Sequence, residues 1–487
     1  MVQSLYKQKQ LLRKLLFLIS FVSLGITLLS NEQYDSVPFL FTLPLSYIFF
    51  LFITKDTFTK KWGLALSIIE LVIFLRYVII PILWSTNQQY NGLVVANADY
   101  NGATLLIAYE LFILSFFFNY LVHRLCINES QSILNPPLKI NKLTPYLLIG
   151  LFLIIVATNS RLRNTLFIFT ITSREDLGLK DGETLADYYN ENVSGIFKIF
   201  FYIGRLVLFN YSLLLINKLN SLTSKYKILL SIIICILYIS CIWSGGVGIS
   251  RWNIIIGLLL SSSLLMTLYP YYINKIRKVS TILIFVTIIL GSMVKIMTNQ
   301  SRSTTISETL THYVNAELFD EYFSGIGAVA NGMRVVEVRN SDKSFERMFV
   351  DCLNTFPYVQ KILGLNDIKP TAKLYHEVTG YQQLIMPNIT ISLFQFGWIF
   401  SPIYSILLLY LALFFNQKLE KTSSIYEKSF LLICTFWCSL FMGLNVNIIN
   451  SNLVAPIIGY IIFSLTSQKS NPFYEKNINN NSRLQCR

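Results

Sequence analysis

The chain alternates long apolar runs with short polar links from end to end. Uncharged runs of about 17 to 25 residues recur, which is the length a helix needs to cross a hydrocarbon layer ~30 Å thick. The pattern predicts an all-α fold, a polytopic transmembrane helical bundle of about twelve spans. The expected spans are residues 15–30, 37–54, 62–84, 102–122, 145–159, 195–216, 228–243, 252–269, 281–297, 389–415, 429–446 and 452–466.

One long interruption divides this series of spans. Residues 298–388 contain no run long enough to cross a bilayer, so they are expected to form one large extracytoplasmic loop between spans nine and ten. The chain is therefore divided into nine spans with short loops (1–297), the large loop (298–388), three further spans (389–466) and a cytoplasmic, disordered tail (467–487).

The positive charge of the chain follows its membrane topology. The 487 residues are 53% hydrophobic and 14% charged, with a net charge of +14. Of the 40 Lys and Arg, 23 fall in the links expected to be cytoplasmic, which hold only 5 Asp and Glu. Under the positive-inside rule this places both termini in the cytoplasm. The basicity is thus a topology signal, and no nucleic-acid partner is expected.

Ionisable residues inside the expected spans require a partner or a wet cavity. Arg76 lies eight residues before Trp84 and Glu110 eight residues after Gly102, so both sit about 12 Å below the outer surface at 1.5 Å per residue. We expect these two side chains to form an ion pair.

Two further cations occupy one face of the sixth span. Lys198 and Arg205 are seven residues apart, so they lie two turns from each other on the same side of the helix. A cationic track descending from the outside would suit an anionic headgroup, because Arg makes bidentate contacts with phosphate. A structural ion network of Arg205 with Arg76 and Glu110 is the alternative.

The link between spans seven and eight and the large loop each show a local pattern. Residues 244–251 hold three glycines in four positions before Arg251, so this turn can approach a ligand closely. Alternatively, it is a tight turn whose arginine extends to the membrane interface.

In the loop, apolar residues repeat at helical spacing from Phe345 to Leu353, which predicts an amphipathic helix. No nucleotide-binding glycine motif and no Cys/His metal cluster is found, and no metal or other cofactor is expected.

Three runs resemble one protein family. The run Glu321–Gly327, the run Met386–Thr390 leading to Phe396–Trp398, and the glycine-rich turn ending in Arg251 are similar to the Wzy-type polymerases of O-antigen and capsule repeat units. The overall layout of a dozen spans and one dominant loop is also similar to that family and to the O-antigen ligases. A spacing found in some members, an arginine followed by glycine eleven positions later, is absent from the loop.

The resemblance implies a reaction and a set of site residues. A sugar hydroxyl of one undecaprenyl-diphosphate-linked oligosaccharide would displace the diphosphate of another on the outer face of the bacterial plasma (inner) membrane. By position, the resemblance assigns the diphosphate to Arg251 and Arg302, and Arg205 and Lys198 are added from the cationic track. His376 or Glu377 would act as the general base, and fixed cations would stabilise the leaving group without a metal.

Two other functions remain open at this stage. An O-antigen ligase-like transferase would differ only in its acceptor, and a polysaccharide flippase would also have about twelve spans. The long loop disfavours the flippase. The partners implied by the resemblance are the lipid-linked oligosaccharide, membrane lipid, a chain-length regulator and a flippase.

Overall fold

The structure is a computed structural model of the full chain. It describes residues 2–30, 39–55, 57, 63–86, 94–95, 97–126, 139–140, 143–164, 166, 195–243, 251–299, 316–353, 362–365, 367–380 and 385–468. The predicted tail (467–487) lies outside these residues from position 469 onwards.

The chain forms two compact units that interleave along the sequence. Unit 1 comprises Met1–Gln131, Thr304–Lys418 and Cys434–Leu453, and unit 2 comprises Ser132–Ser303, Leu419–Ile433 and Val454–Arg487. Most of the predicted large loop therefore belongs to the same unit as the first helices. Each unit is described by itself below.

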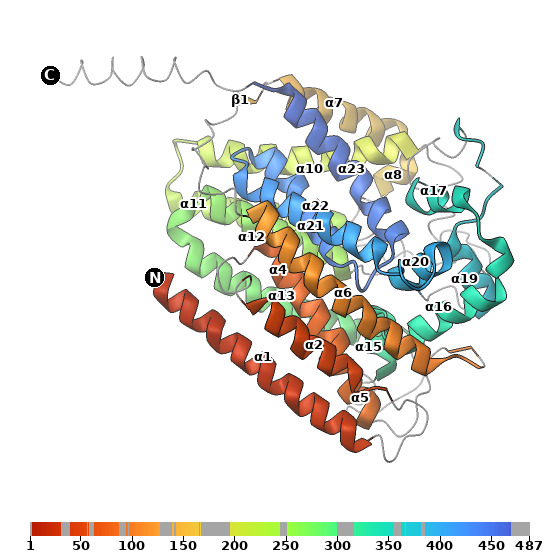
Figure 1. The fold of residues 1–487 in the computed structure, drawn as a ribbon. Helices are drawn as coiled ribbons and strands as arrows, with labels where there is room; N and C mark the ends of the chain where they lie inside the picture. The colour runs from red at the N-terminus through yellow and green to blue at the C-terminus, as the bar shows by residue number, and fades with distance from the viewer. Residues whose placement is uncertain are drawn as a thin grey trace. The chain divides into compact units, whose positions relative to one another are not determined.

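The N-terminal part of unit 1 consists of long apolar helices: α1 (Val2–Ser30), α2 (Thr42–Ile53), α4 (Leu64–Phe74), the π-helical segment η1 (Leu75–Ile79), α5 (Ile80–Thr86) and α6 (Tyr100–Cys126). Helix α1 lies along α2 (Figure 1). The π-helical turn directly precedes Pro81, whose ring crowds the carbonyl group four residues earlier and accounts for the wider turn.

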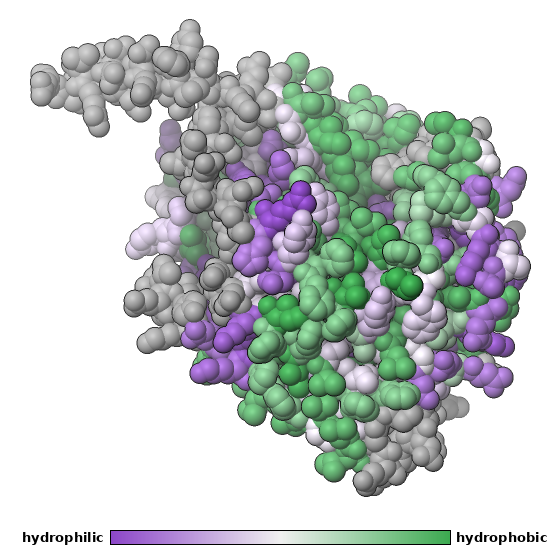
Figure 2. Space-filling view, in the orientation of Figure 1, coloured by the Kyte–Doolittle hydropathy of each residue, from purple (hydrophilic) through white to green (hydrophobic). Residues whose placement is uncertain are grey.

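The predicted loop folds into short helices within unit 1: α15 (Ala316–Phe323), α16 (Ile326–Val338), the 3₁₀ turn η4 (Asn340–Asp342), α17 (Phe345–Leu353) and α19 (Thr371–Thr379), followed by α20 (Asn388–Phe396) and the start of α21 (Ile403–Lys421). Helices α16, α19 and α20 pack on one another around an apolar cluster that includes Val335, Tyr375 and Phe394. Figure 2 shows a hydrophilic patch where α16, α17 and α19 lie and a hydrophobic face over α2 and α6.

Unit 2 is also helical. It contains α7 (Leu143–Thr158), α8 (Ser160–Asn164), α10 (Gly195–Lys218), α11 (Ser224–Trp243), α12 (Arg251–Leu268), the 3₁₀ turn η3 (Pro270–Tyr272) and α13 (Ile273–Asn299). Two-residue strands β1 (Lys139–Ile140) and β2 (Ser467–Gln468) pair antiparallel. Helices α22 (Ile425–Ser439) and α23 (Val446–Thr466) each contribute residues to both units.

The structure shows a helical, membrane-embedded protein. Six helices within the described residues are long and apolar enough to cross a membrane: Lys9–Ser30, Leu64–Thr86, Tyr100–Leu125, Gly195–Lys218, Ser224–Ile242 and Val446–Thr466. A seventh crossing arises if Trp252–Leu268 and Pro270–Ile284, bent by 119°, count as one span. The apolar helices Thr42–Ile53 and Leu143–Thr158 are shorter. The prediction of about twelve spans is therefore supported only in its class, a bundle of apolar helices.

Two predicted spans differ from the structure. Residues 389–415 are not one helix, because α20 ends at Phe396 and Gly397 adopts a φ of 77° that suits glycine alone. Residues 429–446 are also interrupted, since α22 ends at Ser439 and α23 begins at Val446.

The predicted amphipathic helix is present as α17. Phe345 at its start is 69% exposed, whereas Asp351 is fully buried with Val350. The spacing of the apolar residues does not reveal the polar contacts that Asp351 makes in the interior.

Candidate functional site

Helix α19 carries both predicted general bases and is held in place by a carboxylate from another helix. The residue before α19, Pro370, offers no side-chain cap. Asp351 of α17 supplies one: its Oδ1 accepts a hydrogen bond from Thr371 N at 2.7 Å and its Oδ2 one from Thr371 Oγ1 at 2.5 Å. The first amide of α19 is thereby satisfied, and a negative charge lies at the positive end of the helix.

Asp351 is the centre of a buried polar network. Its Oδ2 also accepts a hydrogen bond from Gln395 Nε2 at 2.5 Å, and Gln395 Oε1 accepts one from Tyr404 OH at 2.5 Å. Burial raises the pKa of the Asp351 carboxyl, against the opposing effect of the Thr371 hydrogen bonds. The network joins α17, α19, α20 and α21 into one packed group.

Glu377 is an ionised, salt-bridged residue. Its Oε1 accepts a hydrogen bond from Lys369 Nζ at 2.6 Å, and its Oε2 lies 3.6 Å from Arg339 Nη2. The Lys369 hydrogen bond lowers the pKa of the Glu377 carboxyl, and the charges of Lys369, Arg339 and Lys373 lower it further. A carboxylate with a lowered pKa is a weaker base, so this environment favours His376 over Glu377 as a proton acceptor.

His376 lies next to this charged group on the last turn of α19. Its side chain is half-buried, and its ring lies edge-on to Tyr375 with centroids 6.1 Å apart. Around the neighbouring Glu377, Lys369 and Lys373 come from either side of the start of α19, and Arg339 comes from the end of α16. The sequence pattern does not reveal the contribution of Arg339, because no spacing rule links residues some thirty positions apart.

The first run that carries the family resemblance, Glu321–Gly327, forms the turn between α15 and α16. Asp320 is 1% exposed and accepts hydrogen bonds from the backbone amides of Gly327 at 3.1 Å and Ala328 at 2.9 Å. A Cβ atom at Gly325 would lie 2.3 Å from Asp320 Oδ1, so only glycine fits there. The run thus forms the turn that brings Asp320 to the start of α16.

The second run, Met386–Thr390, ties α20 to the break between α22 and α23. Asn388 Nδ2 donates hydrogen bonds to Phe441 O at 2.6 Å and Leu444 O at 2.8 Å, and its Oδ1 accepts one from Val446 N at 2.6 Å. Asn388 thus satisfies backbone groups that the break leaves without helical partners.

Arg76 and Glu110 are in contact within unit 1. Both side chains are 1% exposed, and Arg76 Nη1 lies 2.8 Å from Glu110 Oε2. Glu110 Oε1 accepts a hydrogen bond from Ser405 Oγ at 2.5 Å. Arg76 lies on the π-helical turn η1. The group connects η1, α6 and α21.

The predicted phosphate ligands Lys198, Arg205, Arg251 and Arg302 all belong to unit 2. Arg205 lies on α10, donates a hydrogen bond to Cys241 O at 3.2 Å, and stacks on the Phe201 and Tyr202 rings. Lys198 lies two turns earlier on the same helix. Arg251 is the first residue of α12, and the structure describes its backbone only. Arg302 lies outside the described residues.

Arg205 contacts the Cys241 carbonyl within unit 2, and Arg76 pairs with Glu110 within unit 1. Among the described residues, no group of three or more His, Cys, Asp or Glu side chains could hold a metal ion.

Comparison of the chain with models of known families, with curated proteins and with solved structures finds no match.

Proposed function

We propose that the chain is a membrane glycan polymerase that joins undecaprenyl-diphosphate-linked oligosaccharide units on the outer face of the plasma membrane. The observation that carries the proposal is α19, in which His376 directly precedes Glu377, the carboxylate that the cations Arg339, Lys369 and Lys373 surround. The resemblance of three sequence runs to repeat-unit polymerases supplies the reaction class.

The chemistry of the cluster suits a diphosphate leaving group. Arg339 and Lys369 share one carboxylate, Glu377, and Lys373 lies nearby. Cations fixed in this way stabilise the negative charge that develops when the bond between the sugar and the diphosphate breaks. Arg contributes a planar fork that matches phosphate oxygens, and Lys contributes a point charge.

His376 is proposed as the general base of the transfer. It takes the proton of the acceptor hydroxyl as that oxygen forms its bond to the anomeric carbon, while the diphosphate leaves with the bonding electrons. An imidazole ring has a nitrogen that can accept the proton of a hydroxyl group, and histidine is the side chain that most often acts as a general base. In this scheme Glu377 keeps Arg339 and Lys369 in place, and Arg251, Arg302, Arg205 and Lys198 stay predicted phosphate ligands for separate mutational tests.

The surface polysaccharide of a cell lacking the gene tests the class of function. A polymerase defect leaves single repeat units attached, a ligase-like defect leaves none attached, and a flippase defect stops export. Single repeat units are the expected product on a gel, and either of the other patterns contradicts the proposal.

Variants of His376 test the base. His376→Ala is expected to accumulate normally in the membrane and to yield only single units, because removal of a base acts on the chemical step. Glu346→Ala, an exposed change on α17, is the matched control and should keep full-length ladders. Full-length ladders from a normally accumulating His376→Ala protein would remove His376 from the mechanism.

A further inference from the structure

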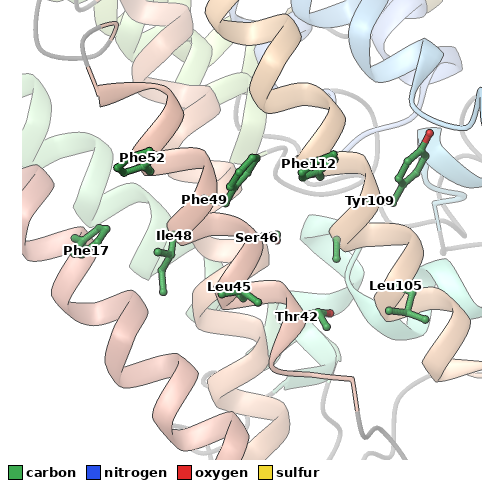
Figure 3. Close-up of a pocket in the computed structure, with 11 residues that line it drawn as sticks. Phe17, Thr42, Leu45, Ser46, Ile48, Phe49, Phe52, Leu105, Tyr109 and Phe112 are labelled. Atoms are coloured by element: carbon green, nitrogen blue, oxygen red, sulfur yellow. The ribbon is translucent and has the colours of Figure 1, made fainter.

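A groove with a volume of about 660 Å³ runs along α2 between α1 and α6, all within unit 1 (Figure 3). Its walls include the side chains of Phe17, Leu45, Phe49, Phe52, Leu105 and Phe112. Phe49 and Phe112 stack across it with ring centroids 5.0 Å apart. The volume lies within the roughly 300–1,000 Å³ range of ligand sites.

The lining of the groove is mainly hydrocarbon, and each of its hydroxyl groups already donates a hydrogen bond within the protein. Thr42, Ser46 and Tyr109 are its polar lining residues, and each already donates to a backbone carbonyl: Thr42 Oγ1 to Phe39 O at 2.7 Å, Ser46 Oγ to Leu43 O at 2.7 Å and Tyr109 OH to Ile399 O at 3.0 Å. A polar occupant would lose its hydrogen bonds to water without replacement. The occupant therefore has a saturated or isoprenoid hydrocarbon part.

The Phe52 end of the groove carries positive charge. Arg13 joins α1 to this end of α2, with Nη1 2.9 Å from Thr54 O and Nη2 2.8 Å from Leu51 O. Beside this junction, Lys14 precedes Phe17 by three residues and Lys55 follows Phe52 by three, and both lysines are exposed. Lys14 and Phe17 are three apart on α1, so they are neighbours on its surface. Lys55 follows the end of α2, where its backbone carbonyl accepts a hydrogen bond from Arg13 Nη1.

Helix α2 is shorter than its neighbours. Its 12 residues extend about 18 Å at 1.5 Å per residue, whereas α1 and α6 have 29 and 27 residues. The groove follows α2 from Thr42 to Phe52, so an apolar chain that lies in it would run along this helix.

We propose that the groove binds an acyl chain of an anionic phospholipid whose headgroup lies against Lys14 and Lys55. The lining selects hydrocarbon, and the two lysines select a negative headgroup at one end. The site is independent of the proposed transfer reaction, since it shares no residue with α19 and its cationic cluster.

The test uses the full-length protein in vesicles of phosphatidylcholine that contain a phosphatidylglycerol with a photoreactive group in mid-chain. Cross-linked peptides are mapped by mass spectrometry, with unlabelled phosphatidylglycerol or phosphatidylcholine as competitor. Adducts on Phe49 and Phe112 should fall with the anionic competitor and resist the zwitterionic one. Adducts on exposed α11 residues such as Ile233 should respond equally to both.

Charge variants separate the headgroup from the groove. The double change Lys14→Gln/Lys55→Gln should reduce the preference for the anionic lipid about 30-fold, since each lysine near anionic lipid contributes about 1 kcal/mol. The matched change Lys275→Gln/Lys278→Gln, at exposed positions of α13, should leave that preference unchanged. An unchanged preference in the first variant would overturn the headgroup assignment.

A second test fills the groove with a larger side chain. Ala108→Phe should abolish the Phe49 and Phe112 adducts, while Ile233→Phe should not. If Ala108→Phe does not accumulate, Ser46→Phe serves the same purpose from α2. Persistent adducts in a filled groove, a retained polyprenyl phosphate in place of the phospholipid, or cross-links to a second copy of the chain would each refute the proposal.

Discussion

Removal of the Asp351 carboxylate should release α19. Asp351→Ala leaves Thr371 N, Thr371 Oγ1 and Gln395 Nε2 without the acceptor that the structure gives them. A hydrogen bond to a charged group contributes about 1.5–3 kcal/mol, and a buried donor without a partner costs about 1–3 kcal/mol. The variant no longer has to bury a carboxylate, and the desolvation free energy that it avoids offsets part of this loss. A net local destabilisation of about 3 kcal/mol remains.

Hydrogen exchange of the α19 backbone amides measures this effect directly. About 3 kcal/mol corresponds to roughly 100-fold faster local opening, read at the amides of residues 374–379. Asp342→Ala is the matched control, because Asp342 is partly exposed and pairs with Arg339 at 3.6 Å. Equal exchange rates in Asp351→Ala and the parent protein would refute the capping role.

Replacing the Asp351 carboxyl with an amide should change the pH dependence of α19. Burial raises the pKa of Asp351 above the ordinary aspartate value of 3.8, so the folded state binds a proton more readily than the unfolded state does. The stability of the parent protein therefore rises relative to that of Asp351→Asn as pH falls through the folded pKa toward 3.8. A difference in exchange rate that stays constant across this interval would contradict the assignment.

Two further predictions concern packing in unit 1. Arg76→Ala should cost about 3–5 kcal/mol by leaving Glu110 buried and unpaired, and Arg76→Leu/Glu110→Leu should recover part of the folded yield in size-exclusion profiles; a double variant no better than the single ones would disprove the coupling. Gly332→Ala should destabilise the protein by about 1–3 kcal/mol, because its Cβ would lie 2.4 Å from Thr390 Oγ1. Gly25→Ala, whose Cβ would meet nothing within 4 Å, should leave the melting temperature unchanged.

Residue counting along a helix placed Arg76 and Glu110 at one depth, and the structure has them in contact. The inference works because the rise per residue is constant and because two opposite charges in an apolar setting have few other partners. The same arithmetic found Lys198 and Arg205 on one face of α10, but it cannot supply the Cys241 carbonyl that Arg205 contacts.

Hydropathy alone missed features that depend on distant partners or on backbone conformation. Asp351 is buried because Thr371 and Gln395, 20 and 44 positions away, donate to it. The long apolar run 389–415 is broken because Gly397 adopts a positive φ, which a hydropathy average does not register. Neither the burial of Asp351 nor the break at Gly397 depends on local hydropathy, so the pattern of apolar residues cannot predict them.

The runs that prompted the family resemblance have structural roles in this chain, which bears on how the proposed function should be tested. Glu321–Gly327 lies beside Asp320, whose carboxylate caps α16, and Met386–Thr390 places Asn388 against the break between α22 and α23. Substitutions in these runs should therefore lower accumulation of the protein first and activity only as a consequence. His376 is half-buried at the end of α19, and as the proposed general base its replacement should lower activity at constant accumulation. Separation of these two behaviours distinguishes residues that build the fold from residues that carry out the transfer.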